Sequence, residues 1–382
     1  MKLLMACYDD LRSGGGSPRR ALRLGSALVK RGHDVHIASK TAQPEHDFTS
    51  QKIQGCTVHW YLAPLGRCWR TPSLCREQAL FHALRHRGIP HSDWALTFSP
   101  FFHHPLKRLT PSIKQAYLFP CLLSNHTPST SLLGKIDAAL LRRIEYRTLT
   151  QADKVILQSP ILEKEIQEFC EIDPAKMRVI RPGIEAATPT KSRAYVRGEL
   201  QTSDEAMVCM AISRLDDNKN VEYILRSVQK LEGNWMLWVA GDGPLAQSLA
   251  ALSDELGISA RVRWLGYRND LADLRAAADV FVHAAWYDTY PQALLEALQS
   301  GLIPIAPRHA PPRVISSAED IYPVNAGFHY DLTDPDALML KLQYIIQQPG
   351  LRAGLSAMAS QFAAKNYDLD VYAEAIEREL LS

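Results

Sequence analysis

Several features that would assign the chain to a specialised class of protein are missing from its 382 residues. No apolar run approaches the roughly 20 residues of a membrane-spanning helix, and the start, MKLLMACYDD, meets two aspartates too early for a signal peptide. The seven cysteines are scattered without a C-x-x-C pair, and none of the 13 histidines lies in H-E-x-x-H. We therefore expect a reduced, cytoplasmic protein with no metal site.

The composition is that of an ordinary globular protein, with 46% hydrophobic and 22% charged residues. A net charge of +2 conceals an uneven distribution, because residues 1–180 carry +10 and residues 181–382 carry −8. This asymmetry indicates two units with different partners. The basic half could face an anionic membrane or a phosphorylated acceptor, or the charge simply varies between domains.

Both halves alternate predicted strands with predicted helices. The first half begins with a strand at 2–7, a glycine loop, a helix at 19–30 and a strand at 35–38, and the second repeats this order between 206 and 306. Such alternation predicts parallel sheets with right-handed crossovers. The fold class is therefore α/β, with two doubly wound Rossmann-like domains and a cleft between them.

A break at 181–185 and an apolar stripe near the end divide the chain. We expect one domain over 1–182, a second over 183–366, and a helix in 367–382 whose apolar stripe must pack on another part of the chain. In the middle of the first domain we expect a helix from Lys135, with apolar positions at Ile136, Ala139, Leu140 and Ile144.

Two polar segments follow predicted strands of the second half, at the sheet edge where ligands bind in such folds. Arg214 and Lys219 bracket one short loop and suit a diphosphate, unless they only pair with the neighbouring aspartates. In the other segment, Asp288 precedes a helix and Glu296 lies within it. These carboxylates could bind hydroxyl pairs of a sugar and a ribose, or serve as a cap and a surface residue.

The start of the helix that contains Glu296 should attract phosphate, because the N–H groups from Gln292 to Leu294 would lack helical partners. A glycine loop, Ser13-Gly-Gly-Gly-Ser17, could also approach a phosphate closely or could be a flexible surface loop. The spacing G-x-G-x-x-G is absent, which argues against a nicotinamide dehydrogenase. His126 lies in a first-half loop near the expected cleft, as a catalytic candidate or a solvated bystander.

Taken together, the segments resemble the retaining family-4 glycosyltransferases of GT-B architecture, of the bacterial cell-envelope and lipopolysaccharide type. The resemblance covers most of the chain in order. Its segments are Gly14-Gly-Gly16 with Lys30-Arg-Gly-His-Asp-Val35, Arg181-Pro-Gly-Ile184, Ser213-Arg-Leu-x-x-x-Lys219-Asn, Gly241-Asp-Gly-Pro-Leu245, Leu265-Gly-Tyr267, Ala276-Ala-Ala-Asp-Val280 and Asp288-Thr-Tyr-Pro-Gln-Ala-Leu-Leu-Glu296.

The resemblance implies contacts to each part of a nucleotide-diphosphate sugar. Gly15, Gly16, Arg214, Lys219, Gln292, Ala293 and Leu294 would hold the diphosphate, Asp288 and Tyr290 the sugar, and Glu296, Tyr267, Gly266 and Leu245 the nucleoside. Asp288 and His126 would act at the reacting centre. The chain departs from the family pattern at Asp288, where Glu is usual, and after residues 115–119, where the expected His is replaced by Pro120 and His126 follows later.

The implied activity is a retaining transfer of a sugar to a glycan or glycolipid acceptor. In the resemblance, residues 1–182 would be the acceptor-binding domain, residues 183–366 the nucleotide-sugar-binding domain, and the helix in 367–382 would cross back to the first domain. The donor would be a UDP-sugar or GDP-sugar, with no cofactor, no metal and no nucleic-acid partner. Peripheral contact with an anionic membrane, at the inner face of the plasma membrane, would suit the basic half. Two alternatives stay open: a non-catalytic homologue that binds the nucleotide sugar, and a nucleotide-sugar epimerase on the same fold.

Overall fold

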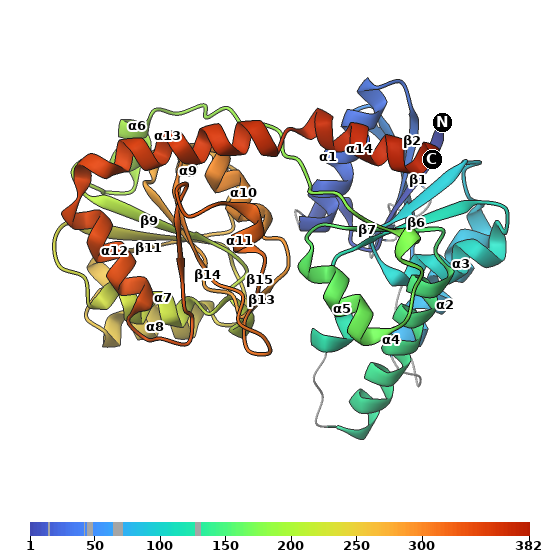
Figure 1. The fold of residues 1–382 in the computed structure, drawn as a ribbon, viewed down its shortest axis with the longest axis horizontal. Coiled ribbons are helices and arrows are strands. Elements are labelled where there is room, and N and C mark those ends of the chain that lie inside the picture. Colours follow the sequence, from blue (N-terminus) through green and yellow to red (C-terminus); the bar gives the residue numbers. More distant parts are fainter. Residues whose placement is uncertain (14–15, 42, 44–48, 64–71, 127–130) are drawn as a thin grey trace. The chain divides into compact units, whose positions relative to one another are not determined.

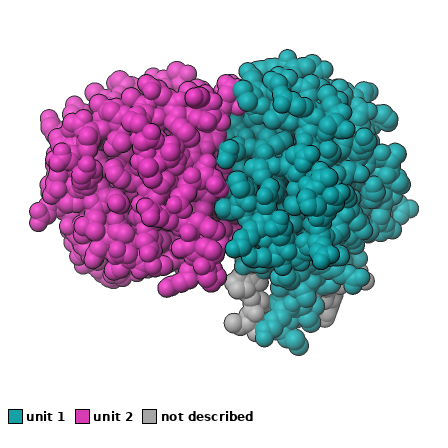
Figure 2. Space-filling view, in the orientation of Figure 1, with its two compact units in different colours: residues 1–183, 369–382 teal, residues 184–368 magenta. Residues whose placement is uncertain are grey.

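The computed structural model describes residues 1–13, 16–41, 43, 49–63, 72–126 and 131–382. The chain forms two compact units, one of residues 1–183 with 369–382 and the other of residues 184–368 (Figure 2). The expected boundaries lie within two residues of these divisions. Each unit is an α/β layer structure, as its alternating sequence predicts.

Unit 1 contains an eight-stranded sheet in the order β3-β4-β2-β1-β5-β6-β7-β8. Every pairing in it is parallel except β3 with β4. Its strands are β1 (Lys2–Cys7), β2 (Asp34–Thr41), β3 (Ser50–Ile53), β4 (Cys56–Leu62), β5 (Trp94–Thr97), β6 (Lys114–Phe119), β7 (Lys154–Leu157) and β8 (Met177–Val179). Its α-helices are α1 (Gly16–Lys30), α2 (Pro72–Arg87), α3 (Pro100–Leu109), α4 (Leu132–Gln151), α5 (Ile161–Phe169) and α14 (Leu369–Leu381).

The last helix belongs to unit 1 because its apolar stripe is buried there. Tyr372, Ala373 and Ile376 of α14 join a core cluster with Leu24 and Leu28 of α1 (Figure 1). The helices α2, α3 and α4 contribute to a second cluster around β1 and β5. Both faces of the sheet are therefore covered, as a parallel sheet requires.

Unit 2 contains a six-stranded parallel sheet in the order β11-β10-β9-β12-β14-β16 and a short pair, β13 with β15. Its strands are β9 (Met207–Ile212), β10 (Trp235–Ala240), β11 (Val262–Gly266), β12 (Val280–Val282), β13 (Tyr287–Asp288), β14 (Ile303–Pro307), β15 (Ile315–Ser316) and β16 (Phe328–Tyr330). Its α-helices are α6 (Arg193–Glu199), α7 (Val221–Gln229), α8 (Ala246–Glu255), α9 (Leu271–Ala277), α10 (Gln292–Gln299), α11 (Ala318–Ile321), α12 (Ala337–Gln347) and α13 (Pro349–Asn366).

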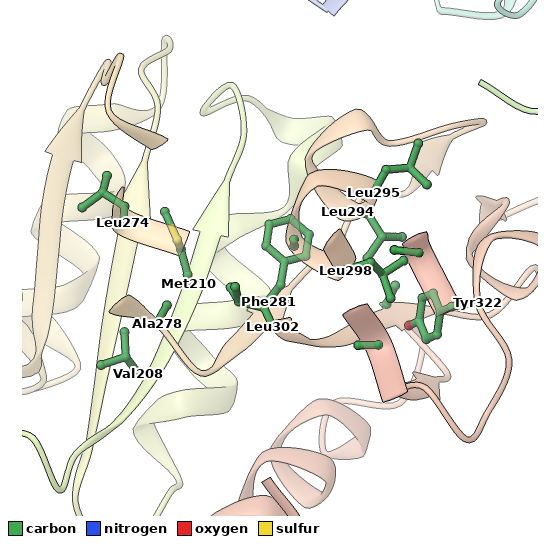
Figure 3. Close-up of a cluster of buried hydrophobic side chains, with 14 of the residues drawn as sticks. Val208, Met210, Leu274, Ala278, Phe281, Leu294, Leu295, Leu298, Leu302 and Tyr322 are labelled. Carbon is green, nitrogen blue, oxygen red and sulfur yellow. The ribbon is translucent and has the colours of Figure 1, made fainter. Parts of the chain in front are cut away.

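A large apolar cluster anchors α10 on the unit 2 sheet. Leu294, Leu295 and Leu298 of α10 pack with Met210 of β9 and Phe281 of β12 (Figure 3). These side chains are completely or almost completely buried, and each contributes roughly 1.5–3 kcal/mol relative to exposure. The packing fixes where the first turn of α10 stands relative to the strand ends.

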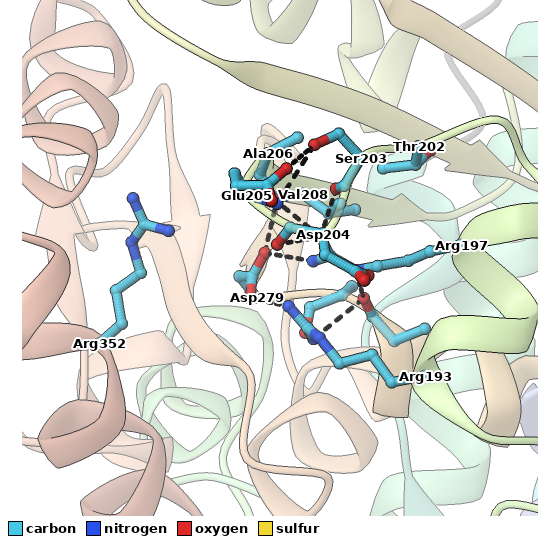
Figure 4. Close-up of polar contacts among 12 residues, drawn as sticks. Arg193, Arg197, Thr202, Ser203, Asp204, Glu205, Ala206, Val208, Asp279 and Arg352 are labelled. Atoms are coloured by element: carbon cyan, nitrogen blue, oxygen red, sulfur yellow. Dashed lines mark hydrogen bonds and ion pairs between the residues drawn. The ribbon is translucent and has the colours of Figure 1, made fainter.

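The amino edge of the unit 2 sheet is held by an ion-pair network that joins a buried and an exposed arginine (Figure 4). Asp279, just before β12, pairs with Arg193 at 2.6 Å and with Arg197 at 2.8 Å, and it accepts a hydrogen bond from the Val208 N–H. Arg197 is fully buried and also donates to the backbone oxygens of Ser203 and Ala206. We assign this network a structural role, because it lies at the amino edge of the sheet, away from the loops that follow the carboxyl ends of the strands.

Two expectations about unit 1 are wrong. In α4 the buried face carries Leu141, Ile144 and Leu149, whereas Ile136 and Ala139 are exposed, because the helix starts three residues earlier and its first turns extend beyond the core. Cys75 is disulfide-bonded, although we expected reduced thiols, since scattered positions in sequence do not measure distances in space.

Among the described residues, no helix has the length and apolarity to cross a bilayer.

Candidate functional site

The loops after β9 and β12 are bound to each other at the carboxyl edge of the unit 2 sheet. The side chain of Asn218 donates to the Tyr287 oxygen at 2.9 Å and accepts from the Tyr287 N–H at 3.0 Å. The Trp286 N–H donates to the Asn218 oxygen at 2.9 Å. These contacts bring the Lys219 loop next to Asp288, which is 69 residues away in sequence.

The loop after β10 approaches the same place through a glycine. Gly241 has a φ of +135°, and a Cβ there would stand 1.8 Å from the oxygen of Ser213. The Ser213 N–H donates to the Ala240 oxygen, and the Gly241 N–H donates to the Gly266 oxygen. Only glycine allows this close passage of three adjacent loops.

The centre of the site is a group of three ionisable side chains. Lys219 Nζ lies 2.6 Å from Asp288 Oδ2, and His283 Nε2, at the end of β12, lies 3.4 Å from the same oxygen. Burial would raise the pKa of Asp288, but the Lys219 charge and the His283 contact outweigh it and hold this pKa well below its ordinary value. Asp288 is therefore a permanent carboxylate, able to accept hydrogen bonds from hydroxyl groups.

The second carboxylate, Glu296, is held by a buried arginine. Arg275 Nη1 of α9 lies 2.9 Å from Glu296 Oε2, and its Nε donates to Ser300 Oγ at 3.2 Å. Both paired side chains are less than 10% exposed. Arg275 is thus a buried partner of Glu296 within the protein and helps to fix the direction of the carboxylate.

The N-terminus of α10 partly matches the expected phosphate site. Among the described residues, no acceptor is found for the N–H groups of Gln292 and Ala293, whereas the Leu294 N–H donates to the Pro291 oxygen at 3.1 Å. The expectation of three free N–H groups is wrong for Leu294, because the first turn closes on Pro291. Tyr290 is only 6% exposed and packs in the core cluster, where it does not face solvent.

Four other predicted residues line the edge without meeting at one point. Arg214 is largely exposed, with Nε 3.6 Å from Asp216 Oδ2. Gly266 and Tyr267 follow β11, and the Tyr267 side chain is 62% exposed. Leu245 lines a cavity of about 320 Å³ between α7 and α8, together with Asp216 and Asn220.

The predicted residues of unit 1 are less defined. Gly15 lies outside the described residues, and Gly16 is the first residue of α1. His126 ends a short 3-10 helix over Leu123–His126 that follows β6. Two residues that contact this turn, Glu145 and Glu165, were not predicted from the sequence.

Two acidic side chains hold the turn that ends at His126. Glu145 of α4 accepts from the Leu123 N–H at 2.5 Å, and Glu165 of α5 accepts from the Asn125 side chain at 3.1 Å. Burial raises the pKa of Glu145 to about 7, although its hydrogen bonds lower it. The sequence offered one signal for Glu145, a carboxylate directly beside the apolar Ile144 in a helix.

Asn218, His283 and Arg275 were also missed in unit 2. Asn218 stands directly before Lys219, and His283 directly follows β12. A polar residue in such a position is a weak but usable signal. Among the described residues, no group of three or more His, Cys, Asp or Glu side chains is arranged to hold a metal ion. The site as a whole offers a carboxylate, a cation and unpaired helix N–H groups, which suits a ligand that carries both hydroxyls and phosphate.

Comparison with known families divides the chain as the fold does. The Glycosyltransferase Family 4 model matches residues 14–188, and the Glycosyl transferases group 1 model matches residues 194–362. The two matches together cover nearly the whole chain.

Curated relatives are distant. The chain is 29% identical over 187 residues to the lipopolysaccharide core biosynthesis glycosyltransferase LpsD of Rhizobium meliloti, in 48% of this chain and 52% of LpsD. LpsE of the same organism is 26% identical over 190 residues, 50% of this chain and 54% of LpsE, so the chain spans about half the length of these two relatives. An uncharacterized glycosyltransferase of Methanocaldococcus jannaschii is 22% identical, over 97% of this chain and 95% of that protein.

Solved structures agree on the fold over the full length. Sucrose-phosphate synthase from Thermosynechococcus elongatus matches with a TM-score of 0.84 at 18% identity, over 99% of this chain and 98% of that chain. HepE of Anabaena in complex with UDP-glucose matches with a TM-score of 0.78 at 16% identity, over 100% and 99%. At these identities the likeness concerns the fold and not the ligand.

Proposed function

Because the chain belongs to the glycosyltransferases of GT-B architecture, with two Rossmann-like domains, we propose that it is a retaining enzyme that uses a nucleotide-diphosphate sugar. The donor in this proposal is a UDP-sugar or a GDP-sugar. The observation that carries the proposal is the partly buried contact between Lys219 and Asp288, just before the start of α10.

The roles of these groups follow from charge. Breaking the bond between sugar and diphosphate leaves negative charge on the departing phosphate, which Lys219, Arg214 and the unpaired N–H groups of Gln292 and Ala293 would stabilise. When phosphate takes Lys219 as its partner, Asp288 is released to accept hydrogen bonds from hydroxyls of the transferred sugar. Glu296, directed by Arg275, would accept from the ribose hydroxyls.

Retention would follow from the same arrangement. The departing phosphate oxygen can take the proton of the acceptor hydroxyl when the acceptor attacks from the face that the phosphate leaves. No protein base is then needed on that face of the sugar. Two cations beside the diphosphate supply the neutralisation that a metal ion would otherwise provide. We therefore propose a reaction that proceeds in the presence of a chelator.

We further propose a cell-envelope glycan or glycolipid as the acceptor, with the enzyme on the cytoplasmic side of the membrane. The name of LpsD, a lipopolysaccharide core glycosyltransferase, supports this class of acceptor. Nucleic acid is not part of the proposal.

The test is turnover of UDP-sugars and GDP-sugars with an envelope extract as acceptor, followed by NMR of the new glycosidic bond. We expect one donor family to react with the anomeric configuration kept. Lys219→Ala should lower kcat/KM about 100-fold or more.

The matched control is Lys230→Ala, because Lys230 also contacts an aspartate, Asp336, at 2.5 Å but on the exposed surface. It should leave turnover unchanged. Tight nucleotide binding without transfer would instead favour a non-catalytic homologue, and donor conversion without an acceptor would favour an epimerase.

A further inference from the structure

A buried arginine in unit 1 has no anionic partner. Arg20, in the second turn of α1, is only 8% exposed. Among the residues that the structure describes, no hydrogen bond or ion pair is found for its guanidinium, and Nε is buried without an acceptor. The guanidinium lies over the ring of Phe98, with Cζ 5.3 Å from the ring centre. A buried charge is normally paired, because leaving it unpaired destabilises the folded state.

The groups that act most strongly on Arg20 are neutral. Burial lowers the pKa of Arg20, and the side chains that oppose this are Tyr372, Cys7, Cys121 and Tyr117. Burial also raises the pKa of Cys7 and Tyr372 to about 12 and that of Tyr117 well above its ordinary value, so these three carry no charge at pH 7. The Tyr372 hydroxyl is buried without a hydrogen-bond partner in the described part of the chain, and its ring belongs to the same apolar cluster as Phe98.

The two carboxylates that follow β1 face other cations. Asp10 forms an ion pair with Arg12 at 2.6 Å. Burial raises the pKa of Asp9, and Lys40 is the cation that opposes this most strongly. These acidic residues therefore leave Arg20 without a counter-charge.

Arg20 lies where the strand order of the unit 1 sheet reverses. From β1 the sheet continues through β2, β4 and β3 on one side and through β5 to β8 on the other. Cys7 is the last residue of β1, and Phe98, directly after β5, donates its N–H to the Ala6 oxygen of β1 at 2.9 Å. Doubly wound sheets bind ligands at such a switch point, beyond the carboxyl ends of the strands. The unpaired cation is thus at the position where a sheet of this kind binds a ligand.

We propose that Arg20 and the Tyr372 hydroxyl bind a carboxylate group of the acceptor. A carboxylate carries one negative charge, which one guanidinium neutralises, and its two oxygens match the planar fork of arginine. A phosphate monoester, with a charge of about −1.5 to −2 at pH 7, would leave excess negative charge in these buried surroundings. The acceptor would then be a sugar acid or another hydroxy acid, alone or at the end of a glycan.

The identification of this ligand as the acceptor rests on the proposed function, in which the donor is bound by unit 2. Binding of the carboxylate itself requires no transfer of a sugar. Carboxylate binding without turnover would therefore refute the proposed function and leave this site in place, whereas turnover with neutral acceptors alone would do the reverse.

The first test is thermal unfolding of the full chain with glucuronate, glucose or inorganic phosphate, at pH 7 and constant ionic strength. At about 100 times its dissociation constant, glucuronate should raise the Tm by roughly 5–10 °C. Glucose lacks the carboxylate and should give no comparable shift at the same concentration. Phosphate should stabilise the protein less than glucuronate does.

Arg20→Met separates a ligand-binding arginine from one that holds the fold together. Because the variant loses a buried charge that has no partner, the Tm of the free protein should rise by roughly 2–4 °C. An arginine that holds the fold would instead lower the Tm when removed. The variant should also lose the stabilisation by glucuronate.

Tyr372→Phe tests the hydroxyl alone. Since this hydroxyl has no partner in the free protein, its removal should not lower the Tm. The affinity for glucuronate, measured by titration calorimetry, should fall about tenfold.

The matched control is Arg142→Met. The Arg142 guanidinium also lies over an aromatic ring, 4.8 Å from the centre of Phe169, but its side chain is exposed. The control should change neither the Tm nor glucuronate binding. The proposal is overturned if glucuronate does not stabilise the protein, if phosphate stabilises it more, if Arg20→Met lowers the Tm or still binds glucuronate, or if Arg20→Met weakens nucleotide binding, which would make Arg20 part of the donor site.

Discussion

Removal of Arg275, whose buried guanidinium contacts Glu296 and Ser300, should lower the free energy of unfolding of unit 2 markedly. Arg275→Met keeps an apolar stem of similar length but leaves Glu296 as a buried carboxylate without its cation. Breaking one partner of such a buried pair costs about 3–5 kcal/mol. For a unit of this size, that corresponds to a drop of roughly 10 °C in the Tm of unit 2.

A double-mutant cycle isolates the pair. The four proteins are the unchanged chain, Arg275→Met, Glu296→Gln and the double variant, compared by chemical denaturation. Because each single change leaves one buried charge without its opposite charge and the double change leaves no charge at either position, we expect a coupling of about 2 kcal/mol or more. The exposed pair of Arg226 with Glu222, at 2.8 Å, is the control and should give about 0.3–0.5 kcal/mol.

The same four proteins also test the functional role of the pair. Glu296→Gln should weaken nucleotide binding, and the loss should be smaller for a 2′,3′-dideoxynucleotide, which lacks the hydroxyls that Glu296 would hold. A coupling as small as that of the control pair would refute the argument that Arg275 directs Glu296.

Three further changes test other parts of the structure. The pKa of Glu145 is raised to about 7, so the folded state keeps this proton to a higher pH than the unfolded state does. The free energy of unfolding should therefore fall as pH rises from about 4.5 to 7. Glu145→Gln should remove most of this loss of up to about 3 kcal/mol, measured by denaturation at each pH. Gly241→Ala should cost about 2 kcal/mol or more and weaken nucleotide binding. Gly257→Ala, where φ is also positive but no atom lies within 4 Å of the added Cβ, should cost about 1 kcal/mol. Arg197→Met should cost about 3–5 kcal/mol in denaturation while nucleotide affinity stays unchanged, because its network lies at the far edge of the sheet.

The positions of the strands along the sequence could be predicted, because each buried strand has a recognisable apolar pattern. Buried parallel strands are continuous apolar runs, and the strands expected at 2–7 and 35–38 are found as β1 and within β2. The helix expected to follow Asp288 and to contain Glu296 is α10, which begins at Gln292 because Pro291 lies just before its first turn. Local sequence was enough for these elements.

The partners of the site residues could not be predicted in the same way. Lys219 and Asp288 were recognised separately, but their contact depends on Asn218, whose side chain joins two loops that are far apart in sequence. Arg275 has no local feature that distinguishes it from an exposed helix residue. In α4, the position of Ile136 depends on how far the helix extends beyond the core, which its periodicity does not show.

Nucleotide binding tests the central claim most directly. Thermal unfolding would be followed with UDP, GDP, ADP and their sugars, for the unchanged chain, Lys219→Ala and the control Lys230→Ala. At about 100 times its dissociation constant, the correct nucleotide should add roughly 2.7 kcal/mol to the stability of the unchanged chain and of the control. Lys219→Ala should lose this gain, whereas no stabilisation by any nucleotide would contradict the assignment of the carboxyl edge of unit 2 as the donor site.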